Sequence, residues 1–197
     1  LDIDVIAGGG RIVTRTLTLE LIGKYSNIIL TEDGTIVEAL RRIGENSSRV
    51  RTVLKGLPYT LPPAQDKMDL LSANINDIIT RVQSESEAKL FQALIGTCLG
   101  FGPVSAKEVC FMAGLAPNIS VSTLDEADFV TLSAALDELR ALMEQPAPSL
   151  RLDENGKVTA MAAFPLSEMP GTRRLSYPTV SALMIDADRR LGSYVIP

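Results

Sequence analysis

The sequence predicts an α+β protein in which a small antiparallel β-rich domain precedes a helical domain. Residues 1–42 alternate apolar and polar side chains between glycine turns, a period typical of half-buried strands. From Leu71 to Met143 the apolar residues recur instead at intervals of three and four, which is typical of amphipathic helices. Between these regions lies Gly56–Pro63, whose prolines disfavour both kinds of regular structure.

Four strands are expected in the N-terminal region. Leu1, Ile3 and Val5 alternate with aspartates, and three glycines then turn the chain into a second strand over residues 11–22. The apolar face of that strand is predicted to comprise Val13, Leu17, Leu19 and Leu21. Strands over residues 27–31 and 35–42 flank the turn Glu32-Asp33-Gly34. The pattern predicts an antiparallel meander with one face in water.

The most basic window of the chain spans residues 41–55. Its five cations are Arg41, Arg42, Arg49, Arg51 and Lys55, and its one acidic residue is Glu45. Clustered guanidinium groups pair with phosphate oxygens, so one interpretation is a contact with an RNA backbone. The other is a solvated loop whose charge is balanced by the nearby Glu32, Asp33 and Glu38. The residues of the window leave both open.

The proline-containing segment Gly56–Pro63 is expected to be an extended linker with Tyr59 as its one large anchor. We therefore expect a domain boundary close to Gln65. The predicted parts are a β-rich domain over residues 1–66, a helical domain over 67–147 and a C-terminal region over 148–197.

The helical domain is expected to be organised around Leu90–Leu115, two helices joined by a Gly-Phe-Gly corner. Pro103 suits the first position of the second helix, and Gly114 suits its end. A helix start after such a corner directs unpaired N–H groups and the positive dipole end outward, which favours phosphate binding. The candidate RNA contacts are Gly100, Gly102, Ser105 and Lys107. An ordinary helix corner inside a helical domain is the alternative.

Further helices are expected on both sides of the corner. One comprises Leu71, Ile75, Ile78, Ile79 and Val82 at helical spacing. Ser84-x-x-Glu87 and Thr123-x-x-Glu126 are interpreted as capping boxes, the second for a helix that ends near Met143. At the corner itself, Gly102→Val is expected to lower stability, because a β-branched side chain would crowd a tight turn between helices. The expected loss is about 1–3 kcal/mol if the backbone there needs a glycine-only conformation.

A β-hairpin and a terminal helix are expected after Pro148. Strands over residues 150–152 and 157–164 flank the turn Asp153-Glu154-Asn155-Gly156. A polar loop follows, and Pro178 is expected to open the last helix. The apolar stripe of that helix is predicted to comprise Val180, Leu183, Met184, Ala187 and Leu191.

The composition excludes several kinds of chemistry. The chain has no histidine, the most common general base and metal ligand, and its two cysteines, Cys98 and Cys110, fall on predicted buried faces. We therefore expect no enzymatic activity, no metal, no cofactor and no small-molecule substrate. The chain has no apolar run of membrane-spanning length and no secretory leader, so we expect a cytoplasmic protein with no membrane contact. A net charge of −5 favours local over general contact with nucleic acid.

Three runs of residues, in this order, resemble the NFACT-N region of the fibronectin-binding protein A family. They are GKYSNIIL from Gly23, SRVRTVLKGLPYTLPP from Ser48 and LIGTCLGFGPVSAKEVCFMAGL from Leu94. That family includes the bacterial RqcH and the eukaryotic ribosome quality control factor NEMF, and the resemblance covers nearly the whole chain. It implies a fold related to formamidopyrimidine-DNA glycosylases, with a helix-hairpin-helix or helix-two-turn-helix unit after the β-rich domain.

The resemblance also implies a function. The expected partners are obstructed large ribosomal subunits that carry peptidyl-tRNA, and hence rRNA and tRNA, and the expected role is to support alanine tailing of stalled chains. A functional Asp-Arg pair of the family is expected just upstream of Leu1, and Asp188-Arg189 does not match it. Lys55 stands where relatives commonly have proline. We therefore expect a piece of a longer protein that binds poorly and supports no tailing alone.

Two other functions are kept as alternatives. A protein-interaction or adhesin domain that binds fibronectin is one, although a missing leader and sparse cysteine count against it. A nucleic-acid repair enzyme of the glycosylase type is the other. That chemistry needs a nucleophilic amine such as an N-terminal proline, whereas Leu1 begins a strand pattern here.

Overall fold

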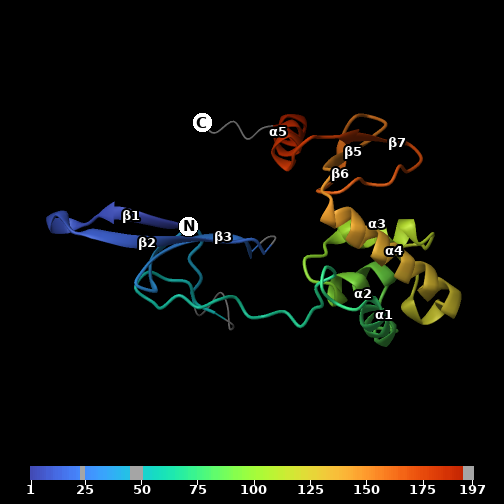
Figure 1. Ribbon diagram of the computed structural model, residues 1–197, viewed down its shortest axis with the longest axis horizontal. Helices are drawn as coiled ribbons and strands as arrows, with labels where there is room; N and C mark the ends of the chain where they lie inside the picture. The colour runs from blue at the N-terminus through green and yellow to red at the C-terminus, as the bar shows by residue number, and fades with distance from the viewer. Residues whose placement is uncertain (23–24, 45–50, 193–197) are drawn as a thin grey trace. The chain divides into compact units, whose positions relative to one another are not determined.

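The structure is a computed structural model that describes residues 1–22, 25–44 and 51–192. Two compact units divide the chain, an N-terminal unit of Leu1–Ala64 and a C-terminal unit of Gln65–Pro197 (Figure 1). Strands dominate the first, whereas the second holds helices, a smaller sheet and a last helix. The protein is therefore α+β, as the sequence predicts. Glu45 and Arg49 lie outside the described residues.

The N-terminal unit is an antiparallel meander of four strands in the order β1-β2-β3-β4. Their bounds are Asp2–Ile6 for β1, Ile12–Glu20 for β2, Asn27–Glu32 for β3 and Thr35–Ala39 for β4. A short 3₁₀ turn, η1 at Gly8–Gly10, connects β1 to β2. Asp33 and Gly34 both have positive φ between β3 and β4, the conformation that a two-residue hairpin turn requires. The predicted meander is confirmed.

Burial on this sheet differs from the expected pattern. Ile29, Ile36, Ala39 and Val53 form the buried cluster, and Tyr59 packs against it. On β2 the predicted apolar face holds only in part, because Leu19 is exposed and Glu20 is buried. Leu21, beyond the end of the strand, is exposed as well. The buried Glu20 carboxylate accepts hydrogen bonds from two side chains of this unit. These bonds allow Glu20 to be buried where the pattern predicts a buried Leu19.

The proline-containing segment is only partly a linker. The Ile36 amide donates to the Leu57 carbonyl at 2.9 Å, and the Tyr59 amide donates to the Gly34 carbonyl at 2.8 Å. Residues 56–59 therefore continue the hydrogen bonding of the sheet beyond β4. Tyr59 anchors this half on the buried cluster, as expected, and the backbone groups of this half also have partners at Gly34 and on β4.

Four α-helices form the first part of the C-terminal unit. They are α1 at Ile75–Ser84, α2 at Leu90–Thr97, α3 at Pro103–Met112 and α4 at Glu126–Glu144, with the 3₁₀ turn η3 at Val121–Thr123 before α4. Their buried faces share one core, which includes Ile78, Leu90, Leu94, Val109, Leu132, Leu136 and Leu139. Leu71 lies before α1 and is exposed, and Met143 near the end of α4 is 37% exposed, contrary to the predicted stripes.

Both predicted capping boxes are wrong. Ser84 is the last residue of α1, and its hydroxyl donates to the Arg81 carbonyl instead of capping α2. Thr123 belongs to η3, and the N-cap of α4 is Asp125. The Asp125 side chain accepts from the Asp128 amide at 2.9 Å, and the Asp128 side chain accepts from the Asp125 amide at 3.1 Å. The cap therefore uses two aspartates.

A second sheet follows, in the order β6-β5-β7. Its strands are β5 at Ser149–Asp153, β6 at Val158–Ala162 and β7 at Thr172–Ser176. The β5–β6 hairpin is confirmed, whereas β7 lies in the segment expected to be a polar loop. The last helix, α5 at Val180–Leu191, has Thr179 as its N-cap, so Pro178 lies outside it.

The last helix packs on the second sheet through a narrow stripe. Leu183 and Ala187 of α5 share a buried cluster with Leu150 and Leu152 of β5. Met184 and Leu191, expected on the same stripe, are exposed. Phe164 and Leu166, just after β6, belong instead to the helical core, so the sheet and the helices form one unit.

Candidate nucleic-acid interface

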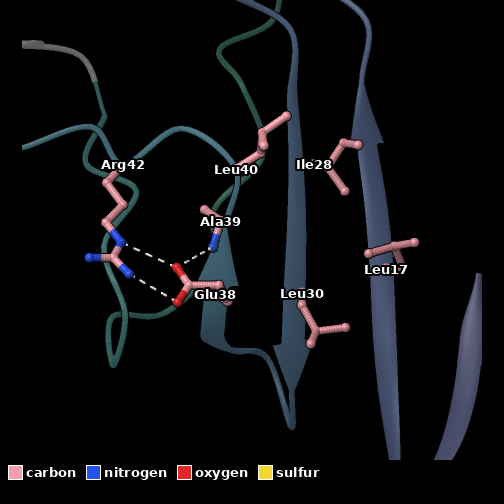
Figure 2. Close-up of a pocket in the computed structure, with 7 residues that line it drawn as sticks. All are labelled: Leu17, Ile28, Leu30, Glu38, Ala39, Leu40 and Arg42. Carbon is pink, nitrogen blue, oxygen red and sulfur yellow. Dashed lines mark hydrogen bonds and ion pairs between the residues drawn. The ribbon is translucent and has the colours of Figure 1, made fainter. Parts of the chain in front are cut away.

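The basic window begins with an exposed ion pair. Arg42 donates through Nε and Nη2 to the two Glu38 carboxylate oxygens, at 3.2 and 3.0 Å (Figure 2). The Arg42 hydrogen bonds, followed by one from the Ala39 amide, hold the Glu38 pKa below its ordinary value. The same contact raises the pKa of Arg42. Arg42 therefore has a carboxylate partner close by, as the interpretation of a charge-balanced loop requires.

An apolar depression lies beside this ion pair. It has a volume of about 750 Å³ and is lined by Leu17, Ile28, Leu30, Ala39 and Leu40 together with the pair itself (Figure 2). Leu40, one of the lining residues, is 72% exposed, so the depression is open to water. Apolar patches of this kind on a folded surface often mark binding sites. The surface around Arg42 is thus chemically mixed and not uniformly basic.

Arg51 takes part in a buried cluster. Its Nη2 donates to Glu20 Oε1 at 2.5 Å, and the Tyr59 hydroxyl donates to the same oxygen at 2.9 Å. The Arg51 guanidinium also lies over the Tyr59 ring, 5.4 Å from its centroid. Burial first, and then the Glu20 hydrogen bond, raises the Tyr59 pKa. Only about a tenth of the Arg51 side chain is exposed, so this cation chiefly holds the loop to the sheet.

The remaining described cations of the window have distinct surroundings. Arg41 is held through its backbone, since its amide donates to Asn27 Oδ1 at 2.8 Å and its carbonyl accepts from Asn27 Nδ2 at 2.9 Å. Lys55 is exposed and lines a shallow depression with Glu32 and Asp33. Acidic side chains therefore lie near Lys55 as well as near Arg42.

The second candidate region is the corner between α2 and α3. Gly100 has φ of +75°, in the left-handed region that glycine favours, whereas Gly102 has φ of −117° and ψ of −176°, an ordinary extended conformation. A Cβ at either glycine would contact nothing within 4 Å. The expected crowding at Gly102 is therefore wrong, and the backbone there does not need a glycine-only conformation. The requirement lies two residues earlier, at Gly100.

The start of α3 has the features expected of an anion-binding helix end. Gly102 is the N-cap and Pro103 the first helical residue, and the first intrahelical bond runs from the Ala106 amide to the Gly102 carbonyl at 3.1 Å. Amides in the first turn of a helix have no intrahelical acceptor. Lys107 is exposed one turn later, with its Nζ 5.9 Å from the centroid of the Phe91 ring. Ser105, two residues before Lys107 in the first turn of α3, is partly exposed.

The buried pair of Glu108 and Arg151 was not expected from the sequence. Arg151 Nη2 donates to Glu108 Oε2 at 2.7 Å, and the Ser167 amide donates to Glu108 Oε1. Both side chains are nine-tenths or more buried. The partners are separated by 43 residues, so no local pattern indicates the pair. It links α3 to β5.

Other reactive groups are absent or inert in the part of the chain that the structure describes. Cys98 and Cys110 are free and buried, and burial raises the pKa of each thiol to about 12. No group of three or more metal-ligating side chains occurs among residues 1–22, 25–44 and 51–192. Within those residues, no helix combines the length and apolarity needed to cross a membrane.

The candidate residues thus fall into two sets. Arg41, Arg42, Arg51 and Lys55 belong to the N-terminal unit, and Gly100, Gly102, Ser105 and Lys107 belong to the C-terminal unit. Within the C-terminal set, Ser105 and Lys107 share the first two turns of α3. Within the N-terminal set, Arg42 and Arg51 use different carboxylates, Glu38 and Glu20. Two of the four described cations of the basic window, Arg42 and Arg51, are thus already paired with carboxylates.

Comparisons with known proteins agree with this architecture. The chain is 38% identical to the Rqc2 homolog RqcH of Bacillus subtilis (strain 168) over 109 residues, which are 54% of this chain and 19% of that protein. It is 29% identical to the Rqc2 homolog RqcH of Streptococcus pneumoniae over 100 residues, 49% of this chain and 18% of that protein. The chain thus matches about a fifth of the length of these relatives.

Solved structures share the fold. The fibrinogen binding protein from Staphylococcus aureus matches 93% of this chain and 62% of its own, with a TM-score of 0.68 and 23% identity. The N-terminal part of the fibronectin/fibrinogen-binding protein from Streptococcus suis matches 95% of this chain and 61% of its own, with a TM-score of 0.59 and 21% identity. The family model for NFACT N-terminal and middle domains matches residues 1–186. The chain therefore belongs to the NFACT N-terminal and middle domain family, in agreement with its three resembling motifs.

Proposed function

We propose that this chain is a non-catalytic module that binds RNA on large ribosomal subunits in a ribosome quality control factor similar to RqcH. The observation that carries the proposal is the 38% identity with the Rqc2 homolog RqcH of Bacillus subtilis. In the proposed setting the partners are rRNA and tRNA of obstructed subunits in the cytoplasm. Support for alanine tailing of stalled chains belongs to the same proposal, as the activity of the whole protein.

The net charge of −5 requires that such a contact be local, because the chain as a whole is repelled by phosphate. The start of α3 supplies first-turn amides, a favourable dipole and the exposed Lys107. Arg41 and Arg42 provide a second cationic position in the N-terminal unit, because the Arg42–Glu38 pair is exposed to water and is therefore weak. Arg51 contributes less to the proposed RNA contact than the sequence predicts, because its guanidinium is paired with the buried Glu20 carboxylate.

A non-catalytic role fits the side chains available. General acid–base chemistry at neutral pH usually relies on histidine, which the sequence lacks. Nucleophilic catalysis by cysteine needs a thiolate, and burial holds both thiols in the neutral form. We therefore propose binding without a cofactor or a small-molecule substrate, and with no membrane partner.

Sedimentation of the chain with purified large ribosomal subunits tests the proposal, at salt concentrations from low to physiological. Binding should weaken steeply with salt, because each neutralised phosphate releases counterions. Replacing Arg41 and Arg42 together with glutamine should flatten the slope of log affinity against log salt by about one to two units. Lys107→Gln should flatten it by about one unit.

The control is the double replacement of Arg189 and Arg190 with glutamine, which removes the same charge from α5. Circular dichroism of each variant checks that the fold is retained. If the control abolishes binding while the other variants bind normally, the RNA contact lies on α5 and the proposed surfaces are wrong. Because the chain alone is expected to bind poorly, the low-salt end of the series, where phosphate contacts are strongest, decides the test: an absence of binding there contradicts the proposed function of the chain itself.

A protein-interaction function is the second candidate, and the apolar depression of Leu17, Ile28, Leu30 and Leu40 favours it. Two solved structures with this fold are named as fibrinogen- or fibronectin-binding proteins. Surface plasmon resonance with immobilised fibronectin tests this function. Leu40→Glu should abolish binding, whereas Leu61→Glu, at a comparably exposed leucine outside the depression, should not. Equal responses from both variants would exclude the depression as the contact.

A further inference from the structure

A groove lies between the start of α3 and the second sheet. It has a volume of about 340 Å³, within the range of about 300–1,000 Å³ typical of small-molecule sites. Its walls include Val104 of α3, Ala160 of β6 and Met169 from the segment before β7. Lys107 and Arg151 also contribute to the lining. The walls are therefore largely apolar, with two cations from α3 and β5.

A hydrogen-bond donor is left over on Arg151. Its Nη2 donates to Glu108 Oε2 at 2.7 Å and its Nη1 contacts Met169 Sδ at 2.6 Å. The side chain is only 8% exposed, and its Nε has no hydrogen-bond partner among the described residues. The nearby hydroxyls of Thr159 and Thr172 donate to the Arg151 and Met169 carbonyls, and neither accepts from Arg151 Nε. A buried donor of this kind favours a ligand that brings an acceptor.

The charges that line the groove indicate which kind of hydrogen-bond acceptor a ligand can bring into it. The Glu108 carboxylate pairs with the Arg151 guanidinium, so the deepest polar groups together carry no net charge. Moving a phosphate into apolar surroundings is costly, whereas a neutral acceptor on a flat apolar ring enters more easily. Lys107 is exposed and adds one uncompensated positive charge to the lining. The groove thus suits a ligand with an apolar ring inside and an anionic group at Lys107.

We propose that this groove binds one unstacked nucleotide of an RNA strand, an inference that rests on the proposed function. The base lies against Val104, Ala160 and Met169, and an acceptor on its edge takes the Arg151 Nε–H hydrogen bond. The phosphate of the same nucleotide pairs with Lys107 at the start of α3. Proteins that read single-stranded RNA hold unstacked bases by stacking and by hydrogen bonds to the base edges. In this groove apolar side chains take the place of aromatic rings.

Titration of the isotopically labelled chain with nucleoside 5′-monophosphates, the matching nucleosides and inorganic phosphate tests the proposal by NMR. Monophosphates should shift the methyl signals of Val104, Ala160 and Met169. Nucleosides should shift the same signals with an affinity about two- to fivefold weaker, as expected for loss of one exposed ion pair. Inorganic phosphate alone should leave them unchanged.

Two variants, Thr159→Tyr and Lys107→Gln, locate the ligand, each with matched controls. Thr159→Tyr, at an exposed residue that lines the groove, should fill the site and lower the affinity for monophosphates by about tenfold or more. Met161→Tyr, two residues further along β6, and Thr159→Val, which removes the hydroxyl without filling the groove, should keep it. Lys107→Gln should make monophosphates bind no more tightly than nucleosides, and Lys157→Gln should have no effect.

The outcomes separate the groove from the proposed function. Equal binding of inorganic phosphate and monophosphates, or no methyl shift with any nucleotide, overturns the groove as a nucleotide site. If Thr159→Tyr leaves sedimentation with ribosomal subunits unchanged while RNA still binds, the groove proposal fails and the proposed function stands. If nucleotides bind the groove but subunits do not bind the chain, the proposed function fails instead.

Discussion

The two glycines of the α2–α3 corner have different conformational requirements. Gly100 lies at φ of +75°, where an L-residue costs about 1–2 kcal/mol, whereas Gly102 is extended. Since neither site is crowded, the backbone conformation alone decides the outcome. Gly100→Ala should lower the free energy of unfolding by about 1 kcal/mol or more, and Gly102→Ala should change it by less than about 0.5 kcal/mol. Urea denaturation of both variants measures the difference. Equal losses would contradict the assignment.

The two buried thiols predict how stability depends on alkaline pH. Burial raises the pKa of Cys98 and Cys110 from the ordinary value of 9.0 to about 12. Between these values the unfolded chain releases thiol protons that the folded chain retains, so stability falls as pH rises. Urea denaturation from pH 8 to pH 11 should show this decrease. In a variant with alanine at both positions the slope should be smaller, and an unchanged slope would assign the effect to other groups.

At the residue scale, local patterns identify burial better than they identify partners. Cys98 and Cys110 are buried as predicted, because helical spacing alone places them on an apolar face. Glu20 and Glu108 could not be predicted as buried residues, since their partners Arg51 and Arg151 lie 31 and 43 residues away. A long-range ion pair leaves no local signal in one sequence. The basic window therefore overstates the charge available to RNA.

At the scale of elements, strands and helices follow from period and turns, whereas their ends depend on local chemistry. The β5–β6 hairpin is confirmed because Asp153–Gly156 is a strong turn signal between two apolar runs. The strand β7, with the sequence TRRLS, lacks the alternating apolar pattern and is defined by its pairing with β5. Both capping boxes were wrong because the Ser/Thr-x-x-Glu pattern is short and occurs by chance.

The aspartate cap of α4 makes an element-scale prediction. Asp125 accepts a hydrogen bond from the Asp128 amide, and its negative charge lies at the positive end of the helix dipole. Asp125→Ala should therefore lower the free energy of unfolding by about 0.5–2 kcal/mol. Thr123→Ala, at the predicted but incorrect cap, serves as the control and should have a smaller effect. A larger loss from Thr123→Ala would contradict the aspartate cap.

At the scale of the whole molecule, the two units have unequal cores. The N-terminal unit has Ile29, Ile36, Ala39 and Val53 as its buried cluster, while Leu19 and Leu40 are more than half exposed. The C-terminal unit buries a much longer set of side chains from four helices and the segment after β6. Because stability rises with buried apolar area, the N-terminal unit should open more easily. The proposed RNA contacts of α3 therefore lie on the more stable framework.

Hydrogen exchange provides the test of this difference. The amides of Ile29 and Ile36 should exchange at least about tenfold faster than those of Leu136 and Leu139, as a difference in opening free energy of about 1.4 kcal/mol or more requires. Ile29→Val removes one methylene from the smaller core and should cost about 0.5–1.5 kcal/mol there. Exchange in β3 and β4 should then accelerate, while exchange in α4 stays constant. Equal acceleration in α4 would instead show that both units unfold in one cooperative step.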